Sequence, residues 1–392
     1  MTWLVLYVYA LPVKLFLKNN LHLGAESVAV FAFLTSMAWN LKPLAGLISD
    51  CFPLLGTRRR HYLMFAAFLG GLSWLLVLLL PKTYTVLLWL LIFMNIMLVM
   101  CSTVLGGLLV EVGQKFSATG RLTAHRTAMM NLAFLVASPL GGYLAGRALG
   151  WTAGLGVVLL FALVPVVWFF LKEKANTERN PAIWRDTGKQ LKTLLRSKPL
   201  WWAVGMNVLL NIMPGFGTPL LYFQQEDLHF SEQFIGNLGF VSGGCGIVGA
   251  LVYSRMCRKI QLGPLIYAGV ICAAISSFVY LGYRSANAAW IIEGCNGAFW
   301  GIAIVVLYDL SARAAPAGCE ALAYSLMMAA GNLAASLSDV VGSWMYEHWH
   351  WKFMDLVWLN GSTTLLILFL IPFLPRVLMD GRDGDHEVVK AS

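Results

Sequence analysis

The chain alternates between long apolar segments and short polar ones. The apolar segments are mostly about 17 to 25 residues long, the length that a helix needs to cross roughly 30 Å of hydrocarbon. The period-2 alternation that is typical of membrane strands does not occur in them. The pattern therefore predicts twelve membrane-spanning helices, at residues 2–18, 27–50, 61–80, 85–111, 126–148, 151–171, 200–223, 233–254, 263–283, 288–311, 321–346 and 353–374.

The composition agrees with a membrane protein. Of the 392 residues, 59% are hydrophobic and only 12% are charged, with a mean hydropathy of +0.71, whereas roughly a quarter of the residues in a soluble domain are charged. The first segment, MTWLVLYVYALP, is short at its N-terminal side and lacks a cleavage site. We interpret it as a membrane helix that is truncated, and not as a signal peptide.

The 28 Lys and Arg residues are unevenly distributed among the loops. If the N-terminus faces the cytoplasm, Lys14 and Lys42 lie within spans, and the outer loops carry only Lys18, Lys82, Arg147, Arg284 and Lys352. Because basic loops stay on the cytoplasmic side, we predict an integral protein of the inner membrane with both termini cytoplasmic. The net charge of +9 is spread over these loops, which does not favour nucleic-acid binding.

The longest polar segment, residues 172–199, separates six predicted spans from six. We therefore expect an N-terminal six-helix half at 1–171, a cytoplasmic linker at 172–199, a C-terminal six-helix half at 200–375 and a cytoplasmic tail at 376–392. In the linker, Trp184, Leu191, Leu194 and Leu195 recur at near-helical spacing. This spacing favours either a short amphipathic helix on the membrane surface or a solvated linker.

The two halves begin with similar sequences. PVKLFLKNNLHL starts at Pro12 and PLLYFQQEDLHF at Pro219, and both carry Pro, Phe, Leu and His at matching positions. The next span of each half ends with a small motif, in which Asp50 in the first half corresponds to Tyr253 in the second. Parallel repeats of six spans are the architecture of one large class of secondary transporters, with the substrate site between the halves.

The segment WNLKPLAGLISDCFPLLGTRRRHYL, residues 39–63, carries an aspartate near the end of a span, followed by three arginines. It resembles the loop motif of the major facilitator superfamily, which implies that these residues latch the inner gate. An aspartate at a helix C-terminus is disfavoured by the helix dipole, so Asp50 needs a cationic partner. The candidates are Arg58, Arg59 and Arg60, which in the alternative interpretation only fix the topology.

A narrower resemblance rests on LPVKLFLKNNLHL, on the 39–63 segment, on PLLYFQQEDLHFSEQFIGNLGFVSGGCGIVGALVYSR and on APAGCEALAYSLMMAAGNLAASLSDVVG. Together these segments resemble the folate-biopterin transporter family. The resemblance implies an all-α polytopic carrier of the major facilitator type that moves pterins or folates by alternating access, driven by protons. Family members have further acidic residues early in the fourth span, where only Glu111 remains here.

Lys42 lies two helical turns before Asp50, some 12 Å deeper in the span. Trp39 precedes it by three residues and shares its face, which would place an aromatic surface beside a cation. This pair suits a flat, anionic ring as substrate. The alternative is that Lys42 forms a structural pair with an acid.

The other acidic residues in spans divide into two groups. Asp339 lies in the outer half of the eleventh span, where a carboxylate without partners would take up a proton readily, so it is a candidate for proton coupling or for a structural role. Glu111, Asp309 and Glu293 lie near helix ends, from which each can reach solvent. Glu111 is a second coupling candidate, and Glu111 and Asp309 also suit the inner gate.

Pro214 and Pro219, with Gly215 and Gly217 between them, predict a break in the seventh span whose freed carbonyls line a cavity. Three aromatic side chains on the predicted cavity helices either stack on a planar solute or face lipid. They are Phe216, Trp300 and Tyr308.

Two other functional classes stay open. A carrier or efflux pump of the same fold for an unrelated amphipathic compound would share these features, and so would a non-transporting membrane scaffold. An enzyme is the weakest interpretation, since the sequence has no P-loop, nucleophile elbow or zinc signature. The seven cysteines lack CxxC spacing, so we expect them to pack the helices. We expect no metal or cofactor, a small-molecule substrate and membrane lipid as partners, and a monomer.

Overall fold

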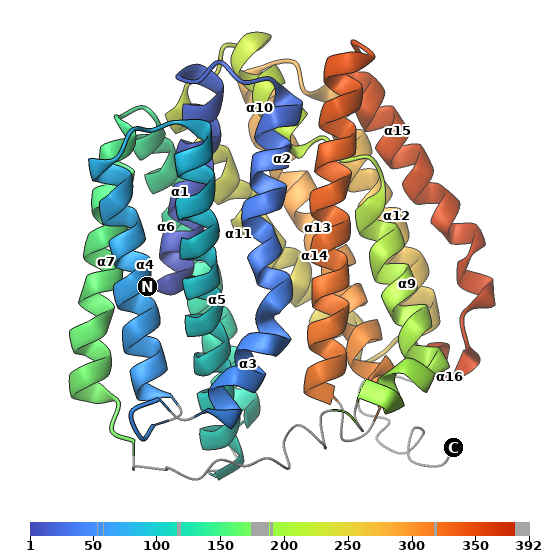
Figure 1. The fold of residues 1–392 in the computed structure, drawn as a ribbon. Helices are drawn as coiled ribbons and strands as arrows, with labels where there is room; N and C mark the ends of the chain where they lie inside the picture. The colour runs from blue at the N-terminus through green and yellow to red at the C-terminus, as the bar shows by residue number, and fades with distance from the viewer. Residues whose placement is uncertain are drawn as a thin grey trace. The chain divides into compact units, whose positions relative to one another are not determined.

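The computed structural model describes residues 1–52, 54–57, 59–115, 119–173, 188, 191–316 and 320–380. Within these residues all named elements are helices, which confirms the predicted fold class (Figure 1). The chain forms two compact units. Unit 1 comprises Met1–Lys189 and Ser231–Asn237, and unit 2 comprises Gln190–Phe230 and Leu238–Ser392.

Unit 1 contains seven α-helices and one 3-10 helix among its described residues. They are α1 (Thr2–Asn19), α2 (Ala25–Ser36), η1 (Met37–Leu41), α3 (Lys42–Cys51), α4 (Arg60–Leu79), α5 (Tyr84–Lys115), α6 (Thr119–Ala145) and α7 (Leu149–Phe170). The helix α4 packs against both α5 and α7, and α1 packs along α6. The second predicted span is therefore two helices, α2 and α3, joined by the tighter turn η1.

Unit 2 contains the rest of the helices. They are α9 (Lys198–Ile212), α10 (Gly217–Glu226), α11 (Glu232–Met256, which starts in unit 1), α12 (Leu262–Phe278), η2 (Val279–Gly282), α13 (Ala286–Ala314), α14 (Glu320–His348), α15 (Phe353–Leu366), η3 (Ile367–Phe369), η4 (Ile371–Phe373) and α16 (Arg376–Met379). Serine side chains cap the starts of α9 and α13 by accepting a backbone N–H, a common way to satisfy a first turn. The helix α9 packs along α14, and α12 packs against α13 and α15.

Each of the twelve predicted ranges is occupied by helix, although the number of membrane spans stays a prediction. Eight helical segments of the described residues are long and apolar enough to cross a membrane, and two shorter apolar ones occur at Ala25–Leu41 and Met129–Ala145. In the predicted linker, residues 191–196 form a helix, with Leu194 buried and Leu191 and Leu195 about half exposed. Trp184 lies outside the described residues.

The duplicated sequence at the start of each half has the same backbone conformation in both copies. His22 after α1 and His229 after α10 both have positive φ, 51° and 53°. The residue before each histidine donates its N–H to the carbonyl of Phe16 or Phe223, five residues earlier, at 3.3 and 3.1 Å. Such hydrogen bonds beside a left-handed residue are a typical helix ending. The repeated sequence therefore forms the same helix-ending turn after α1 and after α10.

Small residues bring α11 and α13 of unit 2 into backbone contact. A Cβ on Gly249 would overlap the carbonyl oxygen of Ala298, and one on Gly297 would overlap that of Ser242. Close approach through small residues is a general way for membrane helices to pack. The GGCGIVGA segment of α11 is thus a packing surface.

Candidate functional site

Lys42 begins α3, directly after the turn η1 that contains Trp39. Its ammonium nitrogen lies 5.3 Å from the ring centroid of Trp39 and 5.9 Å from that of Trp3. The two indoles stack on each other, with centroids 5.4 Å apart and planes at 27°. A cation within about 6 Å of an aromatic face is attracted to the ring. The predicted neighbourhood of Lys42 and Trp39 is present, and α1 adds a second tryptophan to it.

The buried amide of Asn95 on α5 fixes the position of this aromatic group. Its Oδ1 accepts a hydrogen bond from the Trp39 ring nitrogen at 3.0 Å, and its Nδ2 donates to the hydroxyl of Tyr9 at 3.0 Å. Asn95 is only 1% exposed. A buried polar side chain that makes hydrogen bonds to two different helices holds both of them in register.

The environment of Lys42 is positively charged. The guanidinium of Arg126 on α6 is close enough for like-charge repulsion. Within the described residues Lys42 makes no ion pair, although the side chains of Asp50 and Glu111 lie outside them. Asp309 forms its ion pair with Arg313, in unit 2.

Two of the three predicted gate arginines are described, and both contact the end of α7. The carboxylate of Glu173 accepts hydrogen bonds from the backbone N–H groups of Arg59 and Arg60, at 3.0 and 2.8 Å. It therefore caps the start of α4, where a negative charge is favourable. The Arg60 guanidinium also lies 4.4 Å from the ring centroid of Trp168. Arg58 lies outside the described residues.

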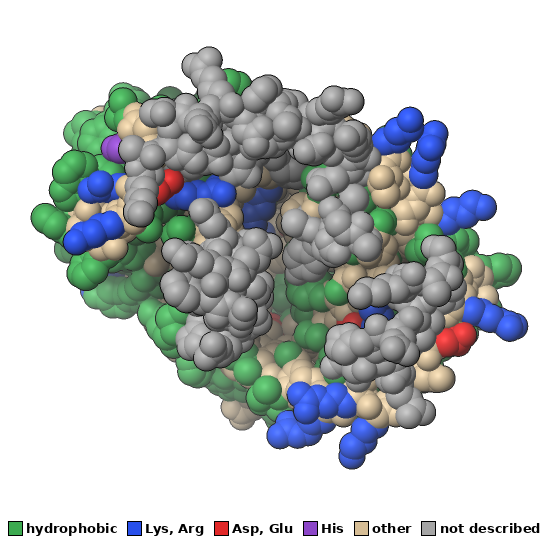
Figure 2. Space-filling view, turned by 90° about the horizontal axis from the view of Figure 1, so that it is seen from below, with side chains coloured by type: hydrophobic (Ala, Val, Ile, Leu, Met, Phe, Trp, Pro, Cys, Tyr) green, Lys and Arg blue, Asp and Glu red, His purple; other side chains and the backbone are tan. Residues whose placement is uncertain are grey.

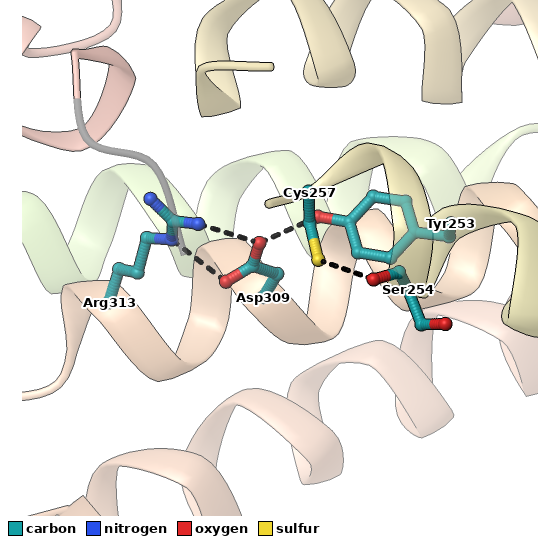
Figure 3. Close-up of polar contacts among 5 residues, drawn as sticks. All are labelled: Tyr253, Ser254, Cys257, Asp309 and Arg313. Atoms are coloured by element: carbon teal, nitrogen blue, oxygen red, sulfur yellow. Dashed lines mark hydrogen bonds and ion pairs between the residues drawn. The ribbon is translucent and has the colours of Figure 1, made fainter. Parts of the chain in front are cut away.

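In unit 2 the predicted gate residue Asp309 is a hydrogen-bonded acid (Figure 3). Asp309 on α13 forms a two-point ion pair with Arg313, one turn later, at 2.8 and 3.0 Å. The hydroxyl of Tyr253 on α11 donates to the same carboxylate at 2.6 Å. Asp309 was expected to reach solvent, and its side chain is 20% exposed. It thus joins α11 to α13 near the C-terminal end of each helix.

The predicted break in the seventh span is confirmed. The helix α9 ends at Ile212 and α10 begins at Gly217. The freed carbonyls do not remain available to a cavity, because other helices satisfy them. Ser338 donates to the Met213 carbonyl, and Asn360 donates to that of Pro214 at 2.9 Å. For these two carbonyls the expectation was wrong.

Asp339 lies at the newly formed start of α10. Its two carboxylate oxygens accept from the Thr218 backbone N–H at 2.8 Å and from the Thr218 hydroxyl at 2.6 Å. A carboxylate is a favourable hydrogen-bond acceptor for the N–H groups and hydroxyls at a helix start. Of the two roles that the sequence left open, these contacts favour the structural one.

The three predicted substrate aromatics belong to unit 2 and do not form one group. Phe216 packs edge-on against Tyr280 and Phe353, with centroids 5.3 and 5.6 Å apart. Trp300 is 39% exposed, and Tyr308 lies about 12 Å further along α13 by helical rise. Of the three, Trp300 has the largest accessible ring.

Glu293 contradicts the expectation of a solvent-exposed acid. It is 7% exposed, and the hydroxyl of Tyr283 lies 3.4 Å from its Oε1.

The described residues contain no group of three or more His, Cys, Asp and Glu side chains arranged to hold a metal ion.

Comparison with known proteins identifies the family. A model of the BT1 family matches residues 5–281 and 299–391. The chain belongs to the BT1 family. It is 28% identical over 404 residues to the folate-biopterin transporter of Synechocystis sp., covering 94% of this chain and 78% of that protein. It is 24% identical over 349 residues to folate transporter 1 of Plasmodium falciparum, covering 83% and 67%.

Solved structures identify the fold of this BT1 family member. The D-xylose-proton symporter superposes with a TM-score of 0.69 at 15% identity, covering 95% of this chain and 96% of that one. A mutant of the nucleoside transporter NupG gives 0.73 at 11% identity, covering 95% and 97%. The fold is that of the major facilitator type. The named relatives are transporters and not enzymes, in agreement with the sequence interpretation.

Proposed function

We propose that this BT1 family protein carries a folate or pterin across the membrane by alternating access, coupled to protons. One observation carries the proposal: the Lys42 ammonium lies over a stack of two indoles that Asn95 holds in place. A flat heteroaromatic ring stacks well on indole, and a substrate carboxylate is attracted to Lys42 and Arg126. The names of the matched relatives point to the same class of solute.

The gate of the carrier is proposed at the polar clusters near the helix ends. In unit 1 it involves Asp50, Arg58, Arg59 and Arg60, and in unit 2 Asp309 with its partners. Such clusters are suited to gating, because their hydrogen bonds can hold helix ends together in one state and release them in another. Trp300 of unit 2 remains a predicted substrate-binding residue and is 39% exposed.

The orientation proposed from the loops places both termini in the cytoplasm. Figure 2 shows the face seen from below Figure 1, where Lys and Arg side chains are prominent and carboxylates are few among the described residues. A basic face of this kind supports a cytoplasmic location by the positive-inside rule.

The proposal is tested with purified protein in liposomes. Lys42→Ala should weaken folate or pterin binding by about tenfold or more, which corresponds to about 1.4 kcal/mol, while the melting temperature stays near that of the unmodified protein. Trp39→Phe should weaken binding less, because a smaller ring remains. Lys82→Ala and Trp89→Phe are the matched controls. Both residues lie outside the cluster of Lys42, Trp3, Trp39 and Asn95 (the Lys42 group), and Trp89 is 65% exposed.

Competition binding experiments distinguish folate or pterin transport from the other functional classes. If unrelated amphipathic compounds displace the solute and pterins do not, the protein is a carrier or efflux pump of different specificity. If no compound stabilises the protein and Lys42→Ala changes nothing, the scaffold interpretation replaces the transport proposal.

A further inference from the structure

Glu293 is the only Asp, Glu, Lys or Arg among the buried polar side chains of the described residues. It lies on α13, two turns after the Ser285 cap and therefore about 10 Å along the helix from its start. No contact of the proposed gate or of the Lys42 group involves it. A buried carboxylate in an apolar helix is expensive and usually has a function.

The polar neighbours of Glu293 form a short chain of hydrogen bonds. Gln224 on α10 donates its Nε2 hydrogen to the Tyr283 hydroxyl at 2.7 Å. Because that oxygen accepts from Gln224, its own proton is directed to Glu293, whose Oε1 lies 3.4 Å away. The last bond is at the long end of the hydrogen-bond range. Tyr280 and Asn296 are further side-chain hydrogen-bond partners of the same carboxyl group.

Aromatic rings cover this chain of hydrogen bonds. Tyr280 and Tyr283 stack with centroids 5.4 Å apart. Tyr280 also packs against Phe216 of α10 at 5.3 Å and against Phe353 of α15 at 6.2 Å. Tyr283 is 0% exposed and Gln224 is 4% exposed. The carboxyl group of Glu293 therefore lies among buried side chains, with the residue 7% exposed.

No cation compensates the buried carboxyl group within the described residues. The titratable groups that face it are Tyr280 and Tyr283, and Cys245 of α11 lies beside the adjacent Gly294. A buried carboxyl group without a cation is costly in an apolar helix, and such groups usually mark ion or proton pathways. Asp339 differs, because it accepts two short hydrogen bonds at a helix start.

We propose that Glu293 is the residue that binds and releases the coupling proton of this carrier. The carboxylate takes a proton from hydronium, leaving water, and it is neutral while the aromatic cover is closed. Movement of α10, which carries Gln224 and follows the break at residues 213–216, admits water and returns the proton to it. This assignment rests on the proposed function, and it moves the coupling role from Asp339 and Glu111 to Glu293.

The test compares two transport modes of reconstituted protein. Glu293→Gln imitates the neutral carboxyl group, so counterflow of labelled folate at equal pH should persist while accumulation driven by a pH gradient is lost. Asp355→Asn, an exposed carboxylate that caps the start of α15, is the control and should retain both. The assignment is overturned if Glu293→Gln still accumulates folate, or if it loses counterflow while melting normally.

A second variant covers the case in which Glu293→Gln does not fold. Tyr283→Phe removes only the hydroxyl donor to the carboxylate, so the pH at which uptake is half-maximal should move upward. An unchanged pH of half-maximal uptake overturns the assignment.

If the unmodified protein moves neither folate nor pterin in counterflow, the proposed function fails by itself. Glu293 is then tested by infrared difference spectra, in which a protonated-carboxyl band of the unmodified protein should vanish in Glu293→Gln. Identical spectra would refute proton binding there.

Discussion

Replacing Asp339 should weaken the fold of unit 2 and leave proton coupling intact. The carboxylate makes two hydrogen bonds to Thr218, at 2.8 and 2.6 Å, at the first turn of α10. Hydrogen bonds to a charged group contribute roughly 1.5 to 3 kcal/mol each, and a charge at a helix start adds about 0.3 to 1 kcal/mol. Two such bonds and the charge at the helix start together give roughly 3 to 7 kcal/mol. Because Asp339 is only partly buried, we take the lower part of this range and expect Asp339→Ala to lower the unfolding free energy by about 3 to 5 kcal/mol.

Asp339→Asn should cost less, about 1 to 2 kcal/mol, because the amide keeps an oxygen for the Thr218 N–H but loses the charge. Reversible unfolding in mixed micelles measures both values. Thr218→Val in both backgrounds completes a double-mutant cycle, whose coupling energy isolates the bond between the two side chains.

Transport assays distinguish this structural role of Asp339 from a role in proton coupling. Folded Asp339→Asn protein should accumulate folate under a pH gradient at a rate that follows its folded fraction, whereas Glu293→Gln should not accumulate it at all. The reasoning is refuted if Asp339→Asn melts like the unmodified protein and has lost only gradient-driven accumulation. Asp339 would then be the proton carrier.

The remaining predictions concern backbone geometry. Gly249→Ala should prevent stable folding, since its Cβ would overlap the Ala298 carbonyl oxygen. Gly244→Ala on the same helix has open space around it and should fold normally. Expression level and monodispersity in detergent are measured for both variants. His229→Gly should raise the unfolding free energy by up to about 1 kcal/mol and His229→Val should lower it, because only glycine adopts positive φ without cost. Equal melting temperatures for the two His229 variants would contradict this explanation of the repeated turn.

The helices were largely predictable from the sequence, and the site only in part. A span needs about twenty apolar residues whatever its neighbours are, so local sequence determines most helix ranges. The neighbourhood of Trp39 and Lys42 was also predictable, because they are three residues apart and such side chains lie almost in line in a 3-10 turn. Trp3 and Asn95 were missed, since they reach the group from other helices. An asparagine within the apolar run of α5 is the signal that could have indicated one of them.

Glu293 was misjudged for a related reason. Its position near a helix end suggested access to solvent, but burial depends on what packs over that end. Here the covering residues are Tyr280 of η2, Tyr283 directly after it, and Gln224 of α10. Distance along one helix does not reveal such a cover.

The break in the seventh span and the acid of the eleventh are one feature, although the sequence presents them separately. Pro214 and Pro219 are sufficient to predict the break, and Asp339 is evident as an acid in an apolar span. What neither segment reveals is that the break creates a new helix start 121 residues before Asp339 in the chain, and that the carboxylate binds there, to Thr218. The adjacent Ser338 and the more distant Asn360 then satisfy the carbonyls released on the other side of the break. A discontinuous helix in a membrane is stable only when its neighbours supply such partners. The break therefore explains the contacts of Asp339 and favours a structural role for it.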